Sequence, residues 1–436
     1  MTVSQHAPRE TLDAYAVIRE EVINQLEERR IPLGSTNIDR VRELVVEIVQ
    51  TYQARAHLGG GRSLADPSGM VSQILASVTD YGPLSELFAR PDIEEIFIEG
   101  DEVAFIDGHG RLQGMTMPTT EQENMQTVER LLATSERHLD AKNPIVQARI
   151  LGGNARLTAT IPPIADVLSA TIRKHSMRRE TLRTLVERGT LTSPAASFIR
   201  ASMQAATSMM VAGSPGTGKT TFTSACIASV PSHHCIRVCE EIRELNTPIV
   251  HGQYYEARPP SLDGGGEVSL RHLVKFVLGM RPDLIVVGEV RGAEAFELTR
   301  AVNAGTGFLC TVHANSAYDA LEAIVNAAIM AGENVGIDIV RKVFSSSIDL
   351  VCFLDRENIS KVDPEKGIRR QIMEIMAVEP SLSNNGFTTS PIFERSDFGR
   401  PLEWTGAVPA CAEKIERSLP RGYTIRGILS GQQPYL

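Results

Sequence analysis

Long apolar runs are absent from this 436-residue sequence. None approaches the roughly 18 to 20 consecutive apolar residues that a membrane-spanning helix needs, and the first residues lack the basic and apolar regions of a signal peptide. We therefore expect the chain to stay in the cytoplasm. Its 42% hydrophobic and 22% charged residues are typical of soluble globular proteins, and its length predicts two or three domains.

The sequence also lacks an excess of basic residues, and it lacks paired cysteines. The formal net charge of -9 and the absence of a basic-aromatic tract argue against direct binding of nucleic acid, which we do not expect as a partner. The six cysteines contain no CxxC pair. His233, His234, Cys235 and Cys239 lie close in sequence, but their spacing fits no common zinc pattern, so we expect reduced, buried thiols.

The pattern of apolar residues divides the chain. Residues 9–53 show the three-and-four spacing of two helices, and a stretch rich in Gly, Ser and Pro follows. The last part alternates apolar strands with helices, which predicts a mainly parallel sheet covered by helices, although its end is rich in turn residues. We predict three domains: a helical region over residues 1–65, a mixed α/β domain over 66–182 and an α/β domain over 183–436.

A glycine-rich loop connects a strand and a helix in the last domain. Its sequence, GSPGTGKT, fits G-x-x-x-x-G-K-[ST] at every fixed position. The glycines let backbone N–H groups face phosphate oxygens, Lys219 reaches the β- and γ-phosphates, and the Thr220 hydroxyl holds Mg²⁺. We predict binding of ATP and Mg²⁺; the alternative is a connecting turn without a ligand. The predicted nucleotide-binding residues are Gly213, Ser214, Pro215, Gly216, Thr217, Gly218, Lys219, Thr220 and Thr221.

Acidic residues and one histidine follow other predicted strands of this domain. Glu289 ends a buried apolar run, at the carboxyl end where ligands of parallel sheets bind, and is the candidate catalytic acid. Glu240, Glu241 and Glu244 follow the preceding strand and are candidates for holding Mg²⁺ through its waters, the alternative being a solvated helix start. His313 ends the next strand, where it either senses the γ-phosphate or has a structural role.

Together these motifs resemble a known family. The phosphate loop at 213–220, Glu240-Glu-Ile-Arg-Glu-Leu245, Met280-Arg-Pro-Asp-Leu-Ile-Val-Val-Gly-Glu-Val-Arg-Gly292 and Thr311-Val-His-Ala-Asn315 resemble, in order and spacing, the secretion ATPases of type II and type IV systems. The nearest resemblance is to the CpaF-type ATPases of Tad/Flp pilus assembly. It extends upstream through Asp80-Tyr-Gly-Pro-Leu-Ser-Glu-Leu87 and covers about residues 70–355.

The resemblance implies an architecture and partners. It implies a homo-hexameric ring in which a PAS-like N-terminal domain, preceded by a small helical extension, is joined to a RecA-like P-loop NTPase domain. The implied partners are pilus or secretion platform proteins of the inner membrane. The implied location is therefore cytoplasmic and peripheral, on the cytoplasmic face of that membrane.

The resemblance also implies roles for individual residues. Lys219 acts on phosphate, Glu289 is the catalytic acid and His313 belongs to a histidine box. Arginines of the family's N-terminal domain lie over the nucleotide, and the matching positions here are Arg156 and Arg173. Guanidinium groups suit this work because their charge is permanent and their fork fits phosphate oxygens. One further arginine matches a family position, Arg149.

We therefore expect a motor that hydrolyses ATP to power Tad/Flp pilus assembly or type II/IV secretion, with a hinge near residues 176–179. The sequence departs from the family at three places. Glu241 replaces the usual aspartate of the acidic box, which is residues 240–245. Residues 303–308 lack the first histidine of the histidine box, and Gln147 replaces an aspartate. Two alternatives remain: a DNA-translocating or conjugation-type ring ATPase, and a nucleotide-dependent scaffold without turnover.

Overall fold

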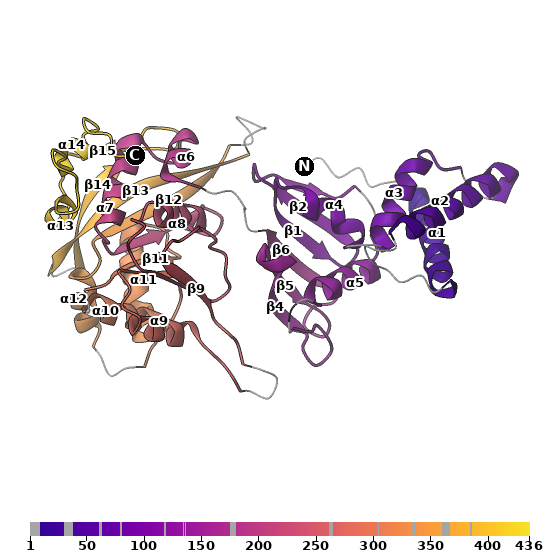
Figure 1. Cartoon of the computed structure of the whole chain (residues 1–436), viewed down its shortest axis with the longest axis horizontal. Helices are drawn as coiled ribbons and strands as arrows, with labels where there is room; N and C mark the ends of the chain where they lie inside the picture. The colour runs from indigo at the N-terminus through magenta and orange to yellow at the C-terminus, as the bar shows by residue number, and fades with distance from the viewer. Residues whose placement is uncertain are drawn as a thin grey trace. The chain divides into compact units, whose positions relative to one another are not determined.

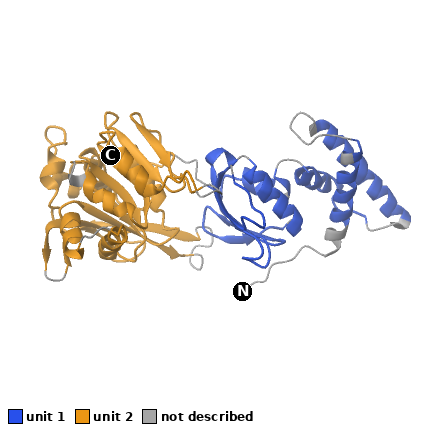
Figure 2. Cartoon of the chain, turned by 90° about the horizontal axis from the view of Figure 1, so that it is seen from below, with its two compact units in different colours: residues 1–176 blue, residues 177–436 orange. Residues whose placement is uncertain are grey.

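The computed structural model places the chain in two units, Met1–Ser176 and Met177–Leu436 (Figures 1 and 2). The predicted hinge at 176–179 lies outside the described residues. Within the described part of the chain, no helix combines the length and the apolar character needed to cross a membrane. The described residues are 9–29, 38–60, 63–78, 81–116, 119–133, 135, 137–174, 180–260, 265–303, 305–332, 336–359, 367–383 and 386–436.

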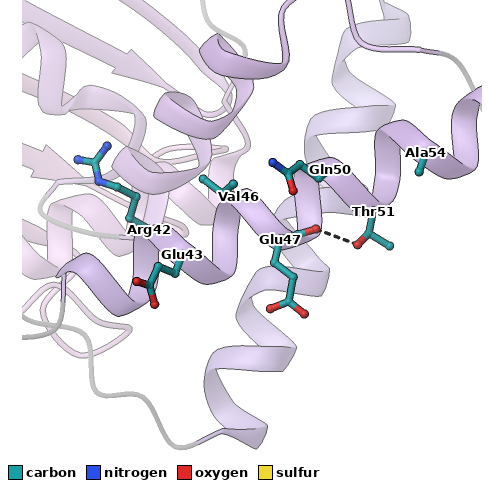
Figure 3. A pocket seen from close by; sticks show the side chains of 7 residues that line it. All are labelled: Arg42, Glu43, Val46, Glu47, Gln50, Thr51 and Ala54. Carbon is teal, nitrogen blue, oxygen red and sulfur yellow. Dashed lines mark hydrogen bonds between the residues drawn. The ribbon is translucent and has the colours of Figure 1, made fainter.

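Unit 1 begins with the helices that the spacing of apolar residues predicts. Helices α1 (Arg9–Glu28), α2 (Ile38–Arg55) and α3 (Pro67–Val78) enclose a core that includes Ile18, Val45 and Ile74. A single π-helical turn, Ala56–Gly60, follows α2. Figure 3 shows the residues that line a pocket at α2, where the Thr51 hydroxyl donates to the Glu47 carbonyl. All of the residues that line this pocket belong to α2.

The rest of unit 1 is an antiparallel sheet with helices on one face. Its strands occur in the order β3-β2-β1-β6-β5-β4. Their bounds are β1 Ile93–Glu99, β2 Glu102–Asp107, β3 Leu112–Gly114, β4 Ile145–Ile150, β5 Ala155–Thr160 and β6 Ser169–Lys174. The 3-10 turn Gly82–Leu84, α4 (Ser85–Ala89) and α5 (Glu121–Leu132) pack on the apolar face, where Ile96, Leu157 and Ile172 are fully buried. The mixed α/β fold is as expected, whereas the PAS-like classification stays a prediction.

Unit 2 is built on a nine-stranded sheet in the order β15-β14-β13-β12-β7-β11-β10-β8-β9. The run from β12 to β9 is parallel throughout, as the alternation of strands and helices predicts. The strands are β7 Met209–Ala212, β8 Ile236–Glu240, β9 Gly252–Glu256, β10 Leu284–Val290, β11 Gly307–Val312, β12 Leu350–Asn358, β13 Ile368–Ser383, β14 Gly386–Glu394 and β15 Glu403–Trp404.

Helices cover both faces of this sheet. Strand β7 shows the division: Met209 and Val211 belong to one hydrophobic core, and Met210 and Ala212 to the other. Because β7 is buried on both faces, its sequence is apolar without alternation. The helices are α6 Leu182–Glu187, α7 Ser193–Gln204, α8 Lys219–Ala228, α9 Leu270–Leu278, α10 Glu294–Asn303, α11 Ala317–Ile329, α12 Ile337–Ser345, α13 Ala412–Glu416 and α14 Ile425–Leu429.

The position of β7 in the sheet fixes the fold class. The glycine-rich loop follows β7, and one strand, β11, separates β7 from β10, which carries Glu289. With β12 on the other side of β7, this is the RecA-like P-loop arrangement that the sequence predicts. The turn-rich end of the chain forms the antiparallel strands β13 to β15, which extend the sheet. All six cysteines are free thiols, and only Cys235 among them is not buried.

Candidate nucleotide site

The glycine-rich loop leaves β7 in a conformation that only glycine adopts without strain. Gly213 has φ of 151°, and a Cβ added to it would lie 2.4 Å from the Leu354 carbonyl oxygen of β12. Gly218, the residue before α8, has φ of 96° in the left-handed region. The loop therefore lies close against the neighbouring strand and points the first turn of α8 into its concave side, the usual geometry for binding an anion.

Lys219 fills this concave side. Its side chain is buried, at 8% exposure, although it carries a charge. The ammonium donates to the carbonyl oxygens of Gly213 at 2.7 Å and Ser214 at 3.0 Å. It also lies 3.2 Å from Nδ1 of His313. The loop thus holds the positive charge where the phosphates of a nucleotide belong.

His313 connects Lys219 to Glu289. Its Nε2 lies 2.6 Å from Oε1 of Glu289. Because an ammonium can only donate, Nδ1 of His313 accepts from Lys219, and Nε2 carries the proton that Glu289 accepts. Burial, and next the charge of Lys219, lower the pKa of His313 below its ordinary value, which favours this neutral form. Lys219 of α8, Glu289 of β10 and His313, which follows β11, thus form one hydrogen-bonded chain.

Arg291 extends this chain, and the sequence analysis missed it. Its Nε and Nη2 donate to the two carboxylate oxygens of Glu289 at 2.6 and 2.7 Å. These hydrogen bonds are the main cause of the raised pKa of Arg291. Glu294 fixes the turn that joins β10 to α10. Its carboxylate accepts from the backbone N–H groups of Arg291, at 2.6 Å, and Gly292, at 2.8 Å. The signal in the sequence was an arginine two residues after the predicted catalytic acid.

The three acidic candidates for the metal have different surroundings. Glu240 is buried, and its Oε1 accepts from the backbone N–H groups of Glu244 at 3.0 Å and Leu245 at 3.1 Å. Burial raises the pKa of Glu240 to about 8, and its Oε2 has no hydrogen-bond partner. Glu241 is exposed and Glu244 is half-buried, and both add to the raised pKa of Arg291 as smaller causes. The acidic box therefore lies next to Glu289 and Arg291.

No group of three or more His, Cys, Asp or Glu side chains among the described residues is arranged to hold a metal ion by itself. In nucleotide sites, phosphate oxygens and waters supply most ligands of Mg²⁺. Thr220 lies in the first turn of α8 and is half-buried, so its hydroxyl is suitably placed beside the loop. The residues present fit Mg²⁺ that arrives with a nucleotide.

The three predicted arginines of unit 1 lie together on one face of its sheet. Arg149 is the direct cross-strand partner of Arg156, which is in turn the partner of Arg173. Arg173 is opposite Glu95 and forms an ion pair with it at 2.6 Å. Directly opposite residues share a face of the sheet, so the row runs over four adjacent strands, with the buried apolar residues on the other face. We call Arg149, Arg156 and Arg173 the arginine row.

Comparison with known proteins decides the family. Residues 80–365 match the family of the type II/IV secretion system protein. The chain belongs to this family. A putative conjugal transfer protein of Mycobacterium tuberculosis is 32% identical over 247 residues, which span 55% of this chain and 70% of that protein. The type IV secretion system protein VirB11 of Bartonella quintana is 27% identical over 315 residues, which span 63% of this chain and 87% of VirB11.

Two solved structures, of a pilus motor and of a type IV secretion ATPase, are also similar. The pilus retraction motor PilT with bound ADP is 18% identical, with a TM-score of 0.49, over 66% of this chain and 81% of PilT. The VirB11 ATPase of Brucella suis in complex with sulphate is 22% identical, with a TM-score of 0.35, over 67% of this chain and 91% of VirB11. Membership of the secretion family, which the match of residues 80–365 shows, is as the motifs predicted, while a special closeness to CpaF-type proteins stays a prediction.

Proposed function

We propose that this member of the secretion family hydrolyses ATP. One observation carries the proposal: the hydrogen-bonded chain from Lys219 through His313 to Glu289, at the carboxyl edge of a parallel sheet and beside a phosphate-binding loop. These hydrogen bonds bring together the ammonium that binds the phosphates and the carboxylate that orients the attacking water. Both are required for phosphoryl transfer to water.

Binding of ATP changes the partners of Lys219. The ammonium exchanges the carbonyls of Gly213 and Ser214 for the β- and γ-phosphate oxygens, which are negatively charged and bind it more strongly. His313 then loses a donor at Nδ1 while it keeps Glu289 at Nε2. The hydrogen bonds of His313 therefore differ between the free and the nucleotide-bound loop, and its contact with Glu289 links this difference to the carboxylate.

Glu289 orients the water that attacks the γ-phosphate. Arg291 holds both oxygens of this carboxylate and His313 also contacts Oε1, which leaves a lone pair on Oε2 to accept from the water. Thr220, with Glu240, Glu241 and Glu244 acting through waters, would hold Mg²⁺, and Mg²⁺ would neutralise part of the phosphate charge. The arginine row of unit 1 supplies further positive charge for turnover.

At the level of the whole protein, we propose a homo-hexameric motor for Tad/Flp pilus assembly or type II/IV secretion. It would act on platform proteins at the cytoplasmic face of the inner membrane. We also propose the division into a helical region, residues 1–65, a PAS-like domain, 66–182, and the ATPase domain, 183–436. The family membership and the nucleotide loop support this proposal.

A DNA-translocating role is the second candidate, because relatives of this chain are named conjugal transfer proteins. The experiment is a phosphate-release assay on the purified full-length protein, alone, with DNA, and with membranes that contain a pilus platform. We expect release that membranes stimulate and DNA does not. Stimulation by DNA alone would favour the second candidate, and no release in any condition would leave only a nucleotide-dependent scaffold.

A further inference from the structure

Two arginines lie against the side of the phosphate loop opposite to Glu289. Strand β12 runs parallel to β7, and Phe353 pairs with Ala212, the last residue of β7. The strand continues beyond this point, which carries Arg356 along the loop. Arg370 of β13 is the direct cross-strand partner of Arg356, so both side chains share one face of the hairpin.

Both guanidinium groups reach the tip of the loop. Nε of Arg370 donates to the Gly216 carbonyl at 2.9 Å, and its Cδ lies 3.8 Å from the position of a Cβ on Gly218. Nη1 of Arg356 lies 2.7 Å from the position of a Cβ on Gly216. Glycine at 216 therefore admits the guanidinium of Arg356. Arg356 is exposed and Arg370 is half-buried, so both remain accessible to a ligand.

The order of strands tells which end of a nucleotide these arginines face. Lys219 and His313 mark the γ-phosphate end, because a P-loop lysine reaches the β- and γ-phosphates. His313 follows β11, on one side of β7, whereas β12 is on the other side. A nucleotide that lies across the loop with its γ-phosphate near His313 extends its α-phosphate and nucleoside toward β12.

The charges of the hairpin differ between its two faces. On one face, Arg369 is opposite Glu357 and pairs with it at 3.3 Å, an ordinary cross-strand ion pair. On the face beside the loop, Arg356 and Arg370 are directly opposite one another, so two permanent positive charges lie against the loop. Guanidinium groups bind phosphate oxygens through paired N–H donors and stack on planar rings.

We infer that Arg356 and Arg370 form a second wall of the nucleotide site, which binds the α-phosphate and ribose end of ATP and ADP. Arg370 also positions the loop through the Gly216 carbonyl. This inference rests on the proposed nucleotide site but not on hydrolysis, since ADP alone tests it. This wall contributes to nucleotide affinity from the β12 side of the loop, whereas His313 and Glu289 lie on the β11 side.

The test is calorimetric titration of the full-length protein with ADP and with a non-hydrolysable ATP analogue. The variants are Arg356→Ala, Arg356→Lys, Arg370→Ala and Arg370→Lys, and the matched control is Arg369→Ala on the other face. Loss of a charge-assisted hydrogen bond predicts about tenfold weaker binding of both nucleotides in each alanine variant, with partial recovery in each lysine variant. We expect KM for ATP to rise in parallel and the control to bind like the wild type.

Three results would overturn the inference. Wild-type ADP affinity in Arg356→Ala and Arg370→Ala would show that neither side chain contacts the nucleotide. Weaker binding of the ATP analogue alone would place the arginines at the γ-phosphate. Weaker binding in Arg370→Ala alone would restrict the effect to positioning of the loop. Thermal unfolding of each variant identifies misfolded protein, and wild-type protein that binds ADP without releasing phosphate would refute the proposed hydrolysis but not this wall.

Discussion

The two sheets of this protein bring their functional side chains together in different ways. In unit 2, Glu240, Glu289 and His313 lie at or directly after the carboxyl ends of three parallel strands, and parallel strands share one carboxyl edge. In unit 1, the arginine row depends on the register of antiparallel strands, in which Arg149, Arg156 and Arg173 are cross-strand neighbours. Topology alone assembles the first group, whereas a shift of one residue in any strand would disperse the second.

The largest effect that this comparison predicts is at Lys219. Lys219→Ala removes the only charge that the phosphate loop itself holds in its concave side, and we expect ATP hydrolysis to fall by about a thousandfold. Phosphate release at saturating ATP measures it. The control is Lys275→Ala, a change at an exposed lysine of α9. A Lys219→Ala protein with more than a tenth of the wild-type rate would contradict the role of the loop.

The buried carboxylate of unit 2 gives a pH-dependent effect on stability. The pKa of Glu240 is raised to about 8, so between pH 4.5 and 8 the folded protein binds more protons than the unfolded chain and loses stability as pH rises. Glu240→Gln keeps an acceptor for the two backbone N–H groups and removes this loss. We expect unfolding free energies that agree near pH 5 and favour the variant by about 3 kcal/mol at pH 8.5.

Urea unfolding in metal-free buffer across this pH range measures the difference. Glu241→Gln, at the exposed neighbouring position, is the matched control and should unfold like the wild type. Equal pH slopes for Glu240→Gln and the wild type would mean that Glu240 titrates at its ordinary pKa and that its burial has no such cost.

Unit 1 should respond in activity and not in stability. Arg156→Ala removes the middle charge of the arginine row, and we expect ATP hydrolysis to fall about tenfold while the melting temperature stays unchanged. Thr158→Ala, two residues along β5 on the same face, is the control. A full rate of hydrolysis in Arg156→Ala would remove the row from the account of turnover.

The smallest effect tests the packing beneath the acidic box. A Cβ on Gly288 would lie 2.6 Å from Cγ of Glu240, so Gly288→Ala must displace a buried side chain. We expect a loss of about 1 kcal/mol in the free energy of unfolding. Gly336→Ala, where a Cβ meets nothing within 4 Å, is the matched control. Equal stability of the two variants would show that Glu240 moves without cost.

The sequence predicted the site where a motif or a strand end determines a position. The glycine loop, Glu289 and His313 are of this kind, because each lies at or after the end of a strand that the apolar pattern identifies. Arg291, Arg356 and Arg370 were missed. Arg291 contacts Glu289 because of a local turn that the spacing of apolar residues does not predict. Arg356 and Arg370 lie in a segment rich in polar and turn residues, from which the long strands β12 and β13 were not predicted.

Register explains the remaining limit in unit 1. The spacing of residues within β4, β5 and β6 predicts which side chains share a face of each strand, but it does not tell which residues of different strands are opposite each other. The resemblance to secretion ATPases identified Arg156 and Arg173 by motif. Their alignment with Arg149 and Glu95 became visible only in the paired strands.

The most direct measurement of the proposed activity compares wild-type and Glu289→Gln protein in steady-state phosphate release at saturating ATP, with ADP affinity measured in parallel. Glutamine keeps the size of the side chain and an acceptor for Arg291 or His313, but it cannot orient water as a carboxylate does. We expect release that falls by about a hundredfold or more in the variant while ADP binding is retained. Equal rates in the two proteins, or no release by the wild type, would contradict the assignment of Glu289 and of ATP hydrolysis.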